Sequence, residues 1–184
     1  VLCKGPNVMM GYYKRPDATA EVIDKDGWFH TGDIGIIEDE KYLKITDRKK
    51  EIFKTSGGKY IAPQMIENKM KEISLVEQCM VVGENQKFAA ALIVPSFIKI
   101  KDMYAKNGKA FTTNEEAIKD PEIIKIIKDG LERVNKSLAS YESIKKFELL
   151  ASDWTIDKGE LTPKLSLKRK VLMEANKGLV DKIY

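Results

Sequence analysis

The stretch GWFHTGD combines a carboxylate and the only histidine of the chain with two aromatic side chains and glycine. The carboxylate of Asp33 can accept two hydrogen bonds at once, and Gly32 beside it permits close backbone approach. His30 is a candidate for proton transfer, although a histidine that is hydrogen-bonded within its loop is the more frequent case. We expect Trp28 and Phe29 to pack the loop. Considered alone, Asp33 would be better explained as a turn or capping aspartate.

Two lysine-rich stretches, DRKKEIFK and TPKLSLKRK, are candidates for contact with anionic groups. Arg48 lies in the first, and the fixed donor fork of arginine suits ribose and phosphate oxygens. In the second, Lys164, Ser166 and Lys168 recur at a spacing of two, so an extended segment would project all three side chains the same way. The alternative for both stretches is a solvated basic face or a docking patch for an anionic partner.

The composition of the 184 residues excludes several classes of protein. A hydrophobic content of 43% predicts a globular chain with one moderate core or two small ones. The net charge is only +4 and lysine supplies most of the positive charge, which argues against nucleic-acid binding. Cys3 and Cys79 have no metal-ligand spacing, which favours a reduced, cytoplasmic compartment. The chain begins with Val1 inside an apparent strand, so we expect a piece of a longer protein.

The hydrophobic pattern predicts an α+β fold of hairpins and packed helices. In the segment IGIIEDEKYLKIT, apolar and polar residues alternate on both sides of an acidic turn, which is the pattern of a β-hairpin. Pro63 starts an amphipathic helix, and the runs VEQCMVV and FAAALIVP are strands joined by the turn GENQK. Ser96 and Asp120 are expected to cap two further helices. A strand in KKFELLA, a loop and a terminal helix complete the chain.

Four segments in this order resemble the carboxyl-terminal motifs of adenylate-forming enzymes, the superfamily of acyl-CoA synthetases, adenylation domains and luciferases. They are GPNVMMGYYKRPDAT, GWFHTGDIG, ITDRKKEIFKTSGGKYIAPQMIE and ELTPKLSLKRK. Within them, DRKKEIFKTSGGKYIAP is most similar to long-chain fatty acyl-CoA synthetases. The resemblance covers nearly the whole chain. It implies a carboxylate ligase that makes acyl-AMP from a fatty acid and ATP and then transfers the acyl group to coenzyme A.

The resemblance also implies a division of the chain. Residues 1–49 would be the end of a large amino-terminal domain, with loops, a β-hairpin and the ribose-binding motif. Residues 50–184 would be a small carboxyl-terminal lid domain that rotates between the two half-reactions. By the same resemblance, Asp33 binds the ribose hydroxyls, Arg48 makes a second nucleotide contact, and Lys50 is the hinge between the domains.

The turn TSGGKY would form part of the coenzyme A tunnel. The pantetheine arm is narrow and carries two amides, and Ser56, Gly57 and Gly58 would leave backbone groups uncovered to hydrogen-bond them. A Gly-Gly pair alone is usually just a turn, so this assignment depends on the resemblance. Glu67, in the following helix, is expected to support the turn and not to react.

The chain departs from the family where adenylation needs a lysine to bridge the α-phosphate and the attacking carboxylate. The family places that lysine four residues after the equivalent of Thr162, and here the residue is Ser166. Lys164 and Lys168 flank it, and either could take its place through a small shift of the loop. We favour Lys168, because it begins the basic run KRK.

The chain lacks a Gly/Ser/Thr-rich phosphate loop and a stretch large enough to hold a long acyl chain. We therefore expect a missing amino-terminal domain to supply both and to bind most of the Mg²⁺, and we expect this chain alone to be inactive. The expected partners are fatty acid, ATP and coenzyme A, with peripheral membrane contact left open. Two alternatives remain: a relative with another second step, such as loading a carrier protein, or a non-catalytic lysine-rich interaction module.

Overall fold

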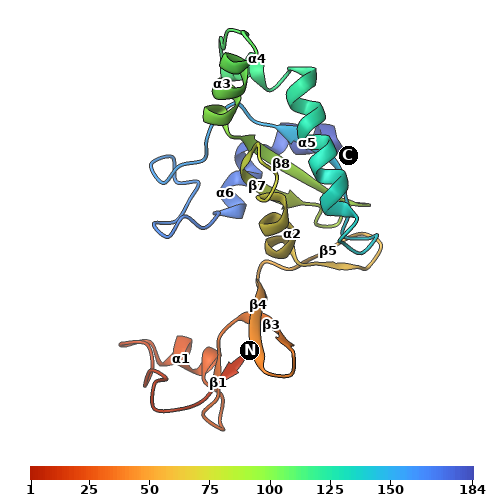
Figure 1. The fold of residues 1–184 in the computed structure, drawn as a ribbon. Coiled ribbons are helices and arrows are strands. Elements are labelled where there is room, and N and C mark those ends of the chain that lie inside the picture. Colours follow the sequence, from red (N-terminus) through yellow and green to blue (C-terminus); the bar gives the residue numbers. More distant parts are fainter. The chain divides into compact units, whose positions relative to one another are not determined.

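The computed structural model describes residues 1–184 and divides them into two compact units, Val1–Ile52 and Phe53–Tyr184 (Figure 1). The mixture of small hairpin sheets and helices confirms the predicted α+β fold. None of the helices combines the length and the apolar character needed to cross a membrane.

The first unit contains two small antiparallel sheets and one helix. In the first sheet β1 (Leu2–Cys3) pairs with β2 (Phe29–His30), and in the second β3 (Asp33–Glu38) pairs with β4 (Tyr42–Arg48). The second sheet is the predicted hairpin. Its turn places Asp39 and Glu40 at φ values of 52° and 54°, the left-handed conformation that tight hairpin turns require.

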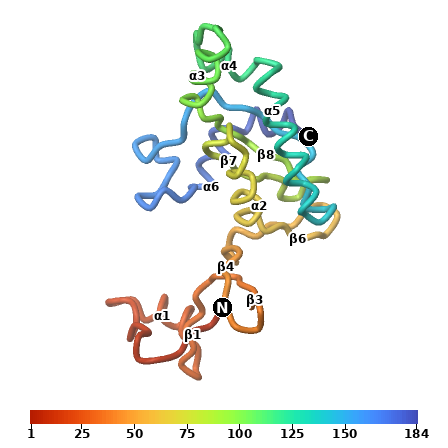
Figure 2. Tube along the Cα trace, viewed as in Figure 1, coloured from red at the N-terminus to blue at the C-terminus, as the bar shows by residue number.

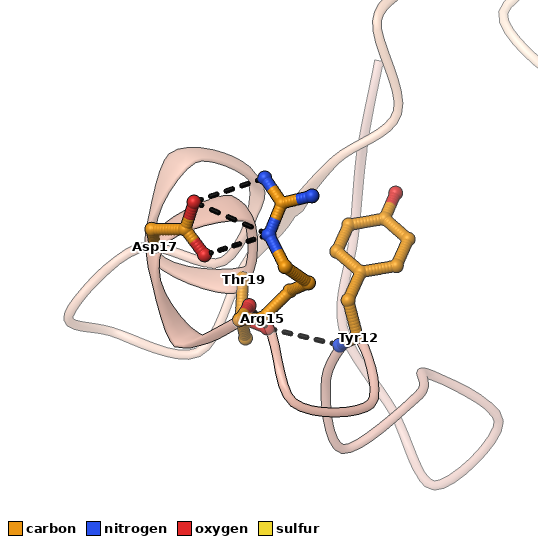
Figure 3. Close-up of polar contacts among 4 residues, drawn as sticks. All are labelled: Tyr12, Arg15, Asp17 and Thr19. Atoms are coloured by element: carbon orange, nitrogen blue, oxygen red, sulfur yellow. Dashed lines mark hydrogen bonds and ion pairs between the residues drawn. The ribbon is translucent and has the colours of Figure 1, made fainter.

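The helix α1 (Pro16–Val22) begins with proline in its first turn and is held to the preceding loop by Thr19. The Thr19 hydroxyl accepts a hydrogen bond from the amide of Tyr12 at 2.9 Å and donates one to the carbonyl of Arg15 at 2.8 Å (Figure 3). The guanidinium of Arg15 binds Asp17 with Nη2 2.9 Å from Oδ2. These contacts hold together the second half of the first family-like motif, GPNVMMGYYKRPDAT.

The second unit is built on a three-stranded sheet of order β7-β8-β9, with β7 (Val76–Val82), β8 (Ala89–Pro95) and β9 (Ile144–Leu149). The pair β7–β8 is the predicted antiparallel hairpin, whereas β8 and β9 are parallel. A parallel pair needs a long crossover connection. Figure 2 traces this crossover in green and teal, through α3, α4 and α5.

The remaining elements of the second unit cover this sheet or precede it. The crossover helices are α3 (Phe97–Lys106), α4 (Asn114–Ala117) and α5 (Pro121–Asn135). A short hairpin of β5 (Phe53–Lys54) and β6 (Tyr60–Ile61) leads into α2 (Pro63–Met70), and the chain ends with α6 (Arg169–Ala175) and α7 (Lys177–Ile183).

The core of the second unit surrounds β8, whose seven residues are all buried. Ile66 and Met70 of α2 and Ile123 and Ile127 of α5 are fully buried beside it. Burial of each such side chain contributes about 1.5–3 kcal/mol of hydrophobic free energy. At Gly130, α5 lies close to the turn that follows α2, because a Cβ atom there would be 2.6 Å from Cγ2 of Ile73.

The predicted helix starts are confirmed in position, but only one of the two expected caps is made. The Asp120 carboxylate accepts a hydrogen bond from the amide of Glu122 at 2.9 Å and so caps α5. Ser96 precedes α3 as expected, yet its side chain makes no capping hydrogen bond. Local sequence therefore determined where both helices begin, whereas the actual cap depends on the side-chain conformation.

Candidate functional site

Asp33 and Arg48, the two predicted nucleotide contacts, lie opposite each other at the open end of the β3–β4 hairpin. Nε of Arg48 lies 2.8 Å from Oδ1 of Asp33, and 24% of the Asp33 side chain and 59% of the Arg48 side chain are exposed. Gly32, beside Asp33, adopts φ +77° as its glycine identity predicted. The structure thus joins a carboxylate acceptor and a guanidinium donor in one solvent-accessible pair.

A β-bulge between Ile34 and Gly35 creates this pairing. The pairing of the two strands is regular from the turn up to the pair formed by Gly35 and Ile45. If this regular register continued without the bulge, Asp33 would lie opposite Asp47. Two carboxylates directly opposite each other would repel. The bulge brings Arg48 opposite Asp33 instead, while Asp47 is fully buried and accepts a hydrogen bond from the amide of Arg48 at 2.6 Å.

His30 is hydrogen-bonded within its own loop. Its Nε2 lies 3.0 Å from Oδ2 of Asp24, and the other oxygen of that carboxylate accepts hydrogen bonds from the amides of Trp28 and Asp26. These contacts, chiefly the Trp28 amide and then His30, lower the pKa of Asp24. Phe29 is half-buried as expected, but Trp28 remains 41% exposed, with the Lys4 ammonium 5.7 Å from its ring centroid.

Lys50, the predicted hinge, lies in the turn that follows β4 and is exposed. The carbonyl of Arg48 accepts hydrogen bonds in this turn from the amides of Glu51 at 2.9 Å and Ile52 at 3.3 Å. The side chain of Lys50 is exposed and makes no ion pair.

Ser56, Gly57 and Gly58 form the exposed turn of the β5–β6 hairpin. The amide of Gly58 donates to the carbonyl of Thr55 at 2.9 Å, and the amide of Ser56 donates to the carbonyl of Gln86 at 2.9 Å. The amides of Ser56 and Gly58 are therefore used within the chain. The Gly57 amide makes no such bond within the chain, and Gly58 needs glycine because its φ is +80°.

The basic loop after Leu161 forms a tight turn, so the prediction of an extended segment is wrong. Leu161 and Leu167 form an isolated antiparallel bridge, and the amide of Thr162 donates to the carbonyl of Ser166 at 2.8 Å. Between them Leu165 adopts φ +61°. Lys164 lies in this turn, so the argument that alternate residues share a face does not apply to it.

Lys168 directly precedes α6 and is exposed. Its amide donates to the carbonyl of Glu160 at 2.8 Å, and its carbonyl accepts the first helical hydrogen bond from Leu172 at 3.1 Å. The structure thus holds the Lys168 backbone on both sides and leaves its ammonium group exposed.

Glu67 and Arg169 form a buried ion pair that the sequence did not reveal. Nη2 of Arg169 lies 2.7 Å from Oε2 of Glu67, and Oε1 of Glu67 accepts a hydrogen bond from the amide of Val81 at 2.7 Å. These contacts connect Glu67 to β7 and α6, whereas we had expected it to support the preceding turn. The two partners are 102 positions apart in the sequence, which explains why no local pattern indicated the pair.

Two other features of the second unit lie apart from the predicted site residues. A hollow of about 830 Å³ lies between α5, β9 and α7, and none of the predicted site residues lines it. Three or more histidine, cysteine, aspartate or glutamate side chains nowhere gather in a geometry that could hold a metal ion.

Comparison with known proteins identifies the family. The family model described as the AMP-binding enzyme C-terminal domain matches residues 50–184. The chain is 37% identical over its whole length to the long-chain-fatty-acid–CoA ligase FadD15 of Mycobacterium tuberculosis, covering 31% of that protein. It is 40% identical to long-chain-fatty-acid–CoA ligase 1 of Cavia porcellus, covering 27% of it. The chain thus spans about three-tenths of the length of these curated relatives.

The fold is also similar to that of solved adenylation domains. The A-PCP didomain of carboxylic acid reductase from Segniliparus rugosus, determined in complex with AMP, matches all of this chain with a TM-score of 0.78 and 27% identity. The match covers 24% of that structure. Because the family model covers most of the chain, and because its relatives and structural neighbours agree, the chain belongs to the AMP-binding enzyme C-terminal domain family, the carboxyl-terminal part of adenylate-forming enzymes.

Proposed function

We propose that this chain is the carboxyl-terminal part of a long-chain fatty acid–CoA ligase and acts in both half-reactions. Its 37–40% identity to long-chain-fatty-acid–CoA ligases over the whole chain supports this substrate class. The observation that carries the proposal is the register of β3 and β4, because it pairs Asp33 with Arg48 at an exposed position.

In the proposed first half-reaction, Asp33 accepts hydrogen bonds from the two ribose hydroxyls of the nucleotide. Arg48 orients that carboxylate, and its remaining guanidinium donors are available for ribose or phosphate oxygens. Attack of the fatty acid carboxylate on the α-phosphate of ATP forms acyl-AMP and releases pyrophosphate. Lys168 stabilises the negative charge that develops at the α-phosphate and the attacking carboxylate, with Lys164 as the alternative.

In the proposed second half-reaction, the thiol of coenzyme A attacks the acyl carbonyl, and AMP leaves with the bonding electrons. Residues Ser56, Gly57 and Gly58 contact the pantetheine arm, the Gly57 amide being the donor that the protein itself does not use. Lys50 is the hinge about which the lid domain changes its orientation between the two steps. ATP and Mg²⁺ are bound mainly by parts of the enzyme outside this chain.

A related adenylate-forming function is the second candidate. The structural neighbour from Segniliparus rugosus is an A-PCP didomain of a carboxylic acid reductase, and its match to the whole chain favours a carrier protein as a possible acyl acceptor. The two candidates share the adenylation step and differ only in the acceptor thiol.

The test measures both half-reactions in the full-length enzyme and in this chain alone. Full-length enzyme should exchange pyrophosphate with ATP in the presence of a long-chain fatty acid and form acyl-CoA when coenzyme A is added. The isolated chain should do neither. Acyl transfer only to a phosphopantetheine-bearing carrier protein would favour the second candidate. Pyrophosphate exchange by the isolated chain would contradict the proposal that ATP is bound mainly by parts of the enzyme outside this chain.

A further inference from the structure

Glu67 contacts both the central sheet and the residue that follows Lys168. One carboxylate oxygen accepts the Val81 amide of β7, and the other pairs with Arg169 at the start of α6. Only 4% of Glu67 is exposed, and 21% of the Arg169 side chain. Nη1 of Arg169 also lies 3.5 Å from the carbonyl of Val81, so the two side chains contact the same residue of β7 from two elements.

This contact lies at the start of α6. Arg169 is the first residue of α6, and Leu172, one turn later, is fully buried. The helix has no side-chain cap at its amino terminus. In place of a cap, the ion pair ties the first residue of the helix to β7 and α2, while the Lys168 amide is held by Glu160.

We propose that Glu67 and Arg169 are positioning residues for the adenylation step, because they hold the Lys168 backbone in place. This inference depends on the proposed function of Lys168. The ammonium group of Lys168 is exposed and lies at the end of a long, flexible side chain. The region that this group can reach, and so its distance from a phosphate, depends on where the Lys168 backbone is held. A displacement of about 1 Å at a charge-stabilising group can cost about a hundredfold in rate.

The alternative is that the pair serves stability alone. Breaking a buried ion pair by removing one partner destabilises a protein by about 3–5 kcal/mol, because the other charge is left unpaired. Such a loss would lower the amount of folded protein and affect both half-reactions alike. A positioning role predicts instead that the folded enzyme loses adenylation while it retains thioester formation.

The experiment uses the full-length enzyme with Arg169→Ala, Arg169→Lys and Glu67→Gln. Lysine keeps the positive charge of residue 169 but lacks the planar guanidinium, whose separate nitrogens contact Glu67 and the Val81 carbonyl. Glutamine keeps an acceptor for the Val81 amide but removes the charge. We expect kcat for acyl-AMP formation to fall about a hundredfold in Arg169→Ala and less in the two conservative variants, with KM for ATP nearly unchanged.

Thioester formation, started from synthetic acyl-AMP and coenzyme A, should stay near the unmodified rate in all three variants. Hydrogen exchange of the backbone amides in residues 160–170 should increase in Arg169→Ala. Ile127→Val is the matched control for stability, since Ile127 is fully buried in α5. It should lower Tm without changing adenylation or the exchange of residues 160–170.

The outcomes separate this inference from the proposed function. If the unmodified enzyme makes acyl-AMP and Arg169→Ala slows both half-reactions equally, or slows neither, the positioning role is wrong. Unchanged hydrogen exchange in residues 160–170 would also overturn it. If the unmodified enzyme makes no acyl-AMP, the proposed function itself fails.

Discussion

Asp33 and Arg48 face each other across the β3–β4 hairpin, with Nε of the arginine 2.8 Å from Oδ1 of the aspartate. An exposed ion pair of this kind contributes little to stability by itself, about 0–1 kcal/mol. Under the proposed function, the ion pair would order the Asp33 carboxylate before the nucleotide binds.

The first prediction concerns the coupling between these two residues. Asp33→Ala and Arg48→Ala in the full-length enzyme should each weaken nucleotide binding about tenfold or more, since each removes a charge-assisted contact. The double variant should lose less than the sum of the two free-energy changes. Calorimetric titration with AMP measures all three. Arg15→Ala breaks another exposed ion pair, with Asp17, and is the matched control that should leave AMP affinity unchanged.

The second prediction concerns Gly35 at the β-bulge. A Cβ atom there would lie 2.9 Å from the carbonyl oxygen of Lys44, so Gly35→Ala must displace the facing strand. We expect the bulge to shift and AMP affinity to fall about as far as in Arg48→Ala. Gly178→Ala is the control, because nothing lies within 4 Å of its Cβ position in α7. Unchanged AMP affinity in Gly35→Ala would show that the bulge does not set the nucleotide contact.

The third prediction identifies the lysine that acts in adenylation. Lys168→Ala should slow acyl-AMP formation by about two to three decades and spare thioester formation from synthetic acyl-AMP. Lys164→Ala should have a much smaller effect, because Lys164 lies in the exposed turn. Ser166→Lys tests whether the family pattern raises the adenylation rate. The opposite ranking of the two alanine variants would transfer the role to Lys164, and no effect of either would favour a docking patch.

The fourth prediction concerns Lys50. Lys50→Pro sets φ near −65° and removes an amide that donates no hydrogen bond within the chain, so the fold should be retained. If the restricted state is the adenylating one, pyrophosphate exchange should persist while thioester formation is lost. Lys50→Ala should retain both reactions. Equal loss of the two half-reactions in a folded Lys50→Pro enzyme would count against the hinge.

The fifth prediction concerns acid stability. Lys109, and then Tyr104, lower the pKa of Asp120 to about 2, whereas an unfolded aspartate titrates near 3.9. A carboxyl group whose pKa is lowered by folding stabilises the folded state at pH values above the pKa of the unfolded state. This contribution is lost as pH falls from about 4 towards 2. It should amount to about 1 kcal/mol, given the partly exposed Lys109. Asp120→Asn keeps a good capping residue, so its denaturation midpoint should approach that of the unmodified chain as pH falls through this window.

Local patterns located many elements of the fold, although α1 and the division of the expected terminal helix into α6 and α7 were not predicted. The hydrophobic period located α2 and the strands β7 and β8, and Asp120 followed by Pro121 located the start of α5. Such signals depend on residues a few positions apart, whose spacing the chain itself defines. The basic loop was predicted incorrectly because Leu165 adopts a left-handed conformation that a leucine rarely takes.

The sequence by itself determined which residues are present at each family motif, and therefore which chemical groups are available. Only the tertiary structure decided which of them meet. A single bulge places Asp33 opposite Arg48, whereas the regular register would have placed it opposite Asp47. Folding also brings Glu67 into contact with Arg169, 102 positions further along the sequence. Register and long-range pairing depend on the packing of the whole unit, because no short stretch of sequence contains both partners.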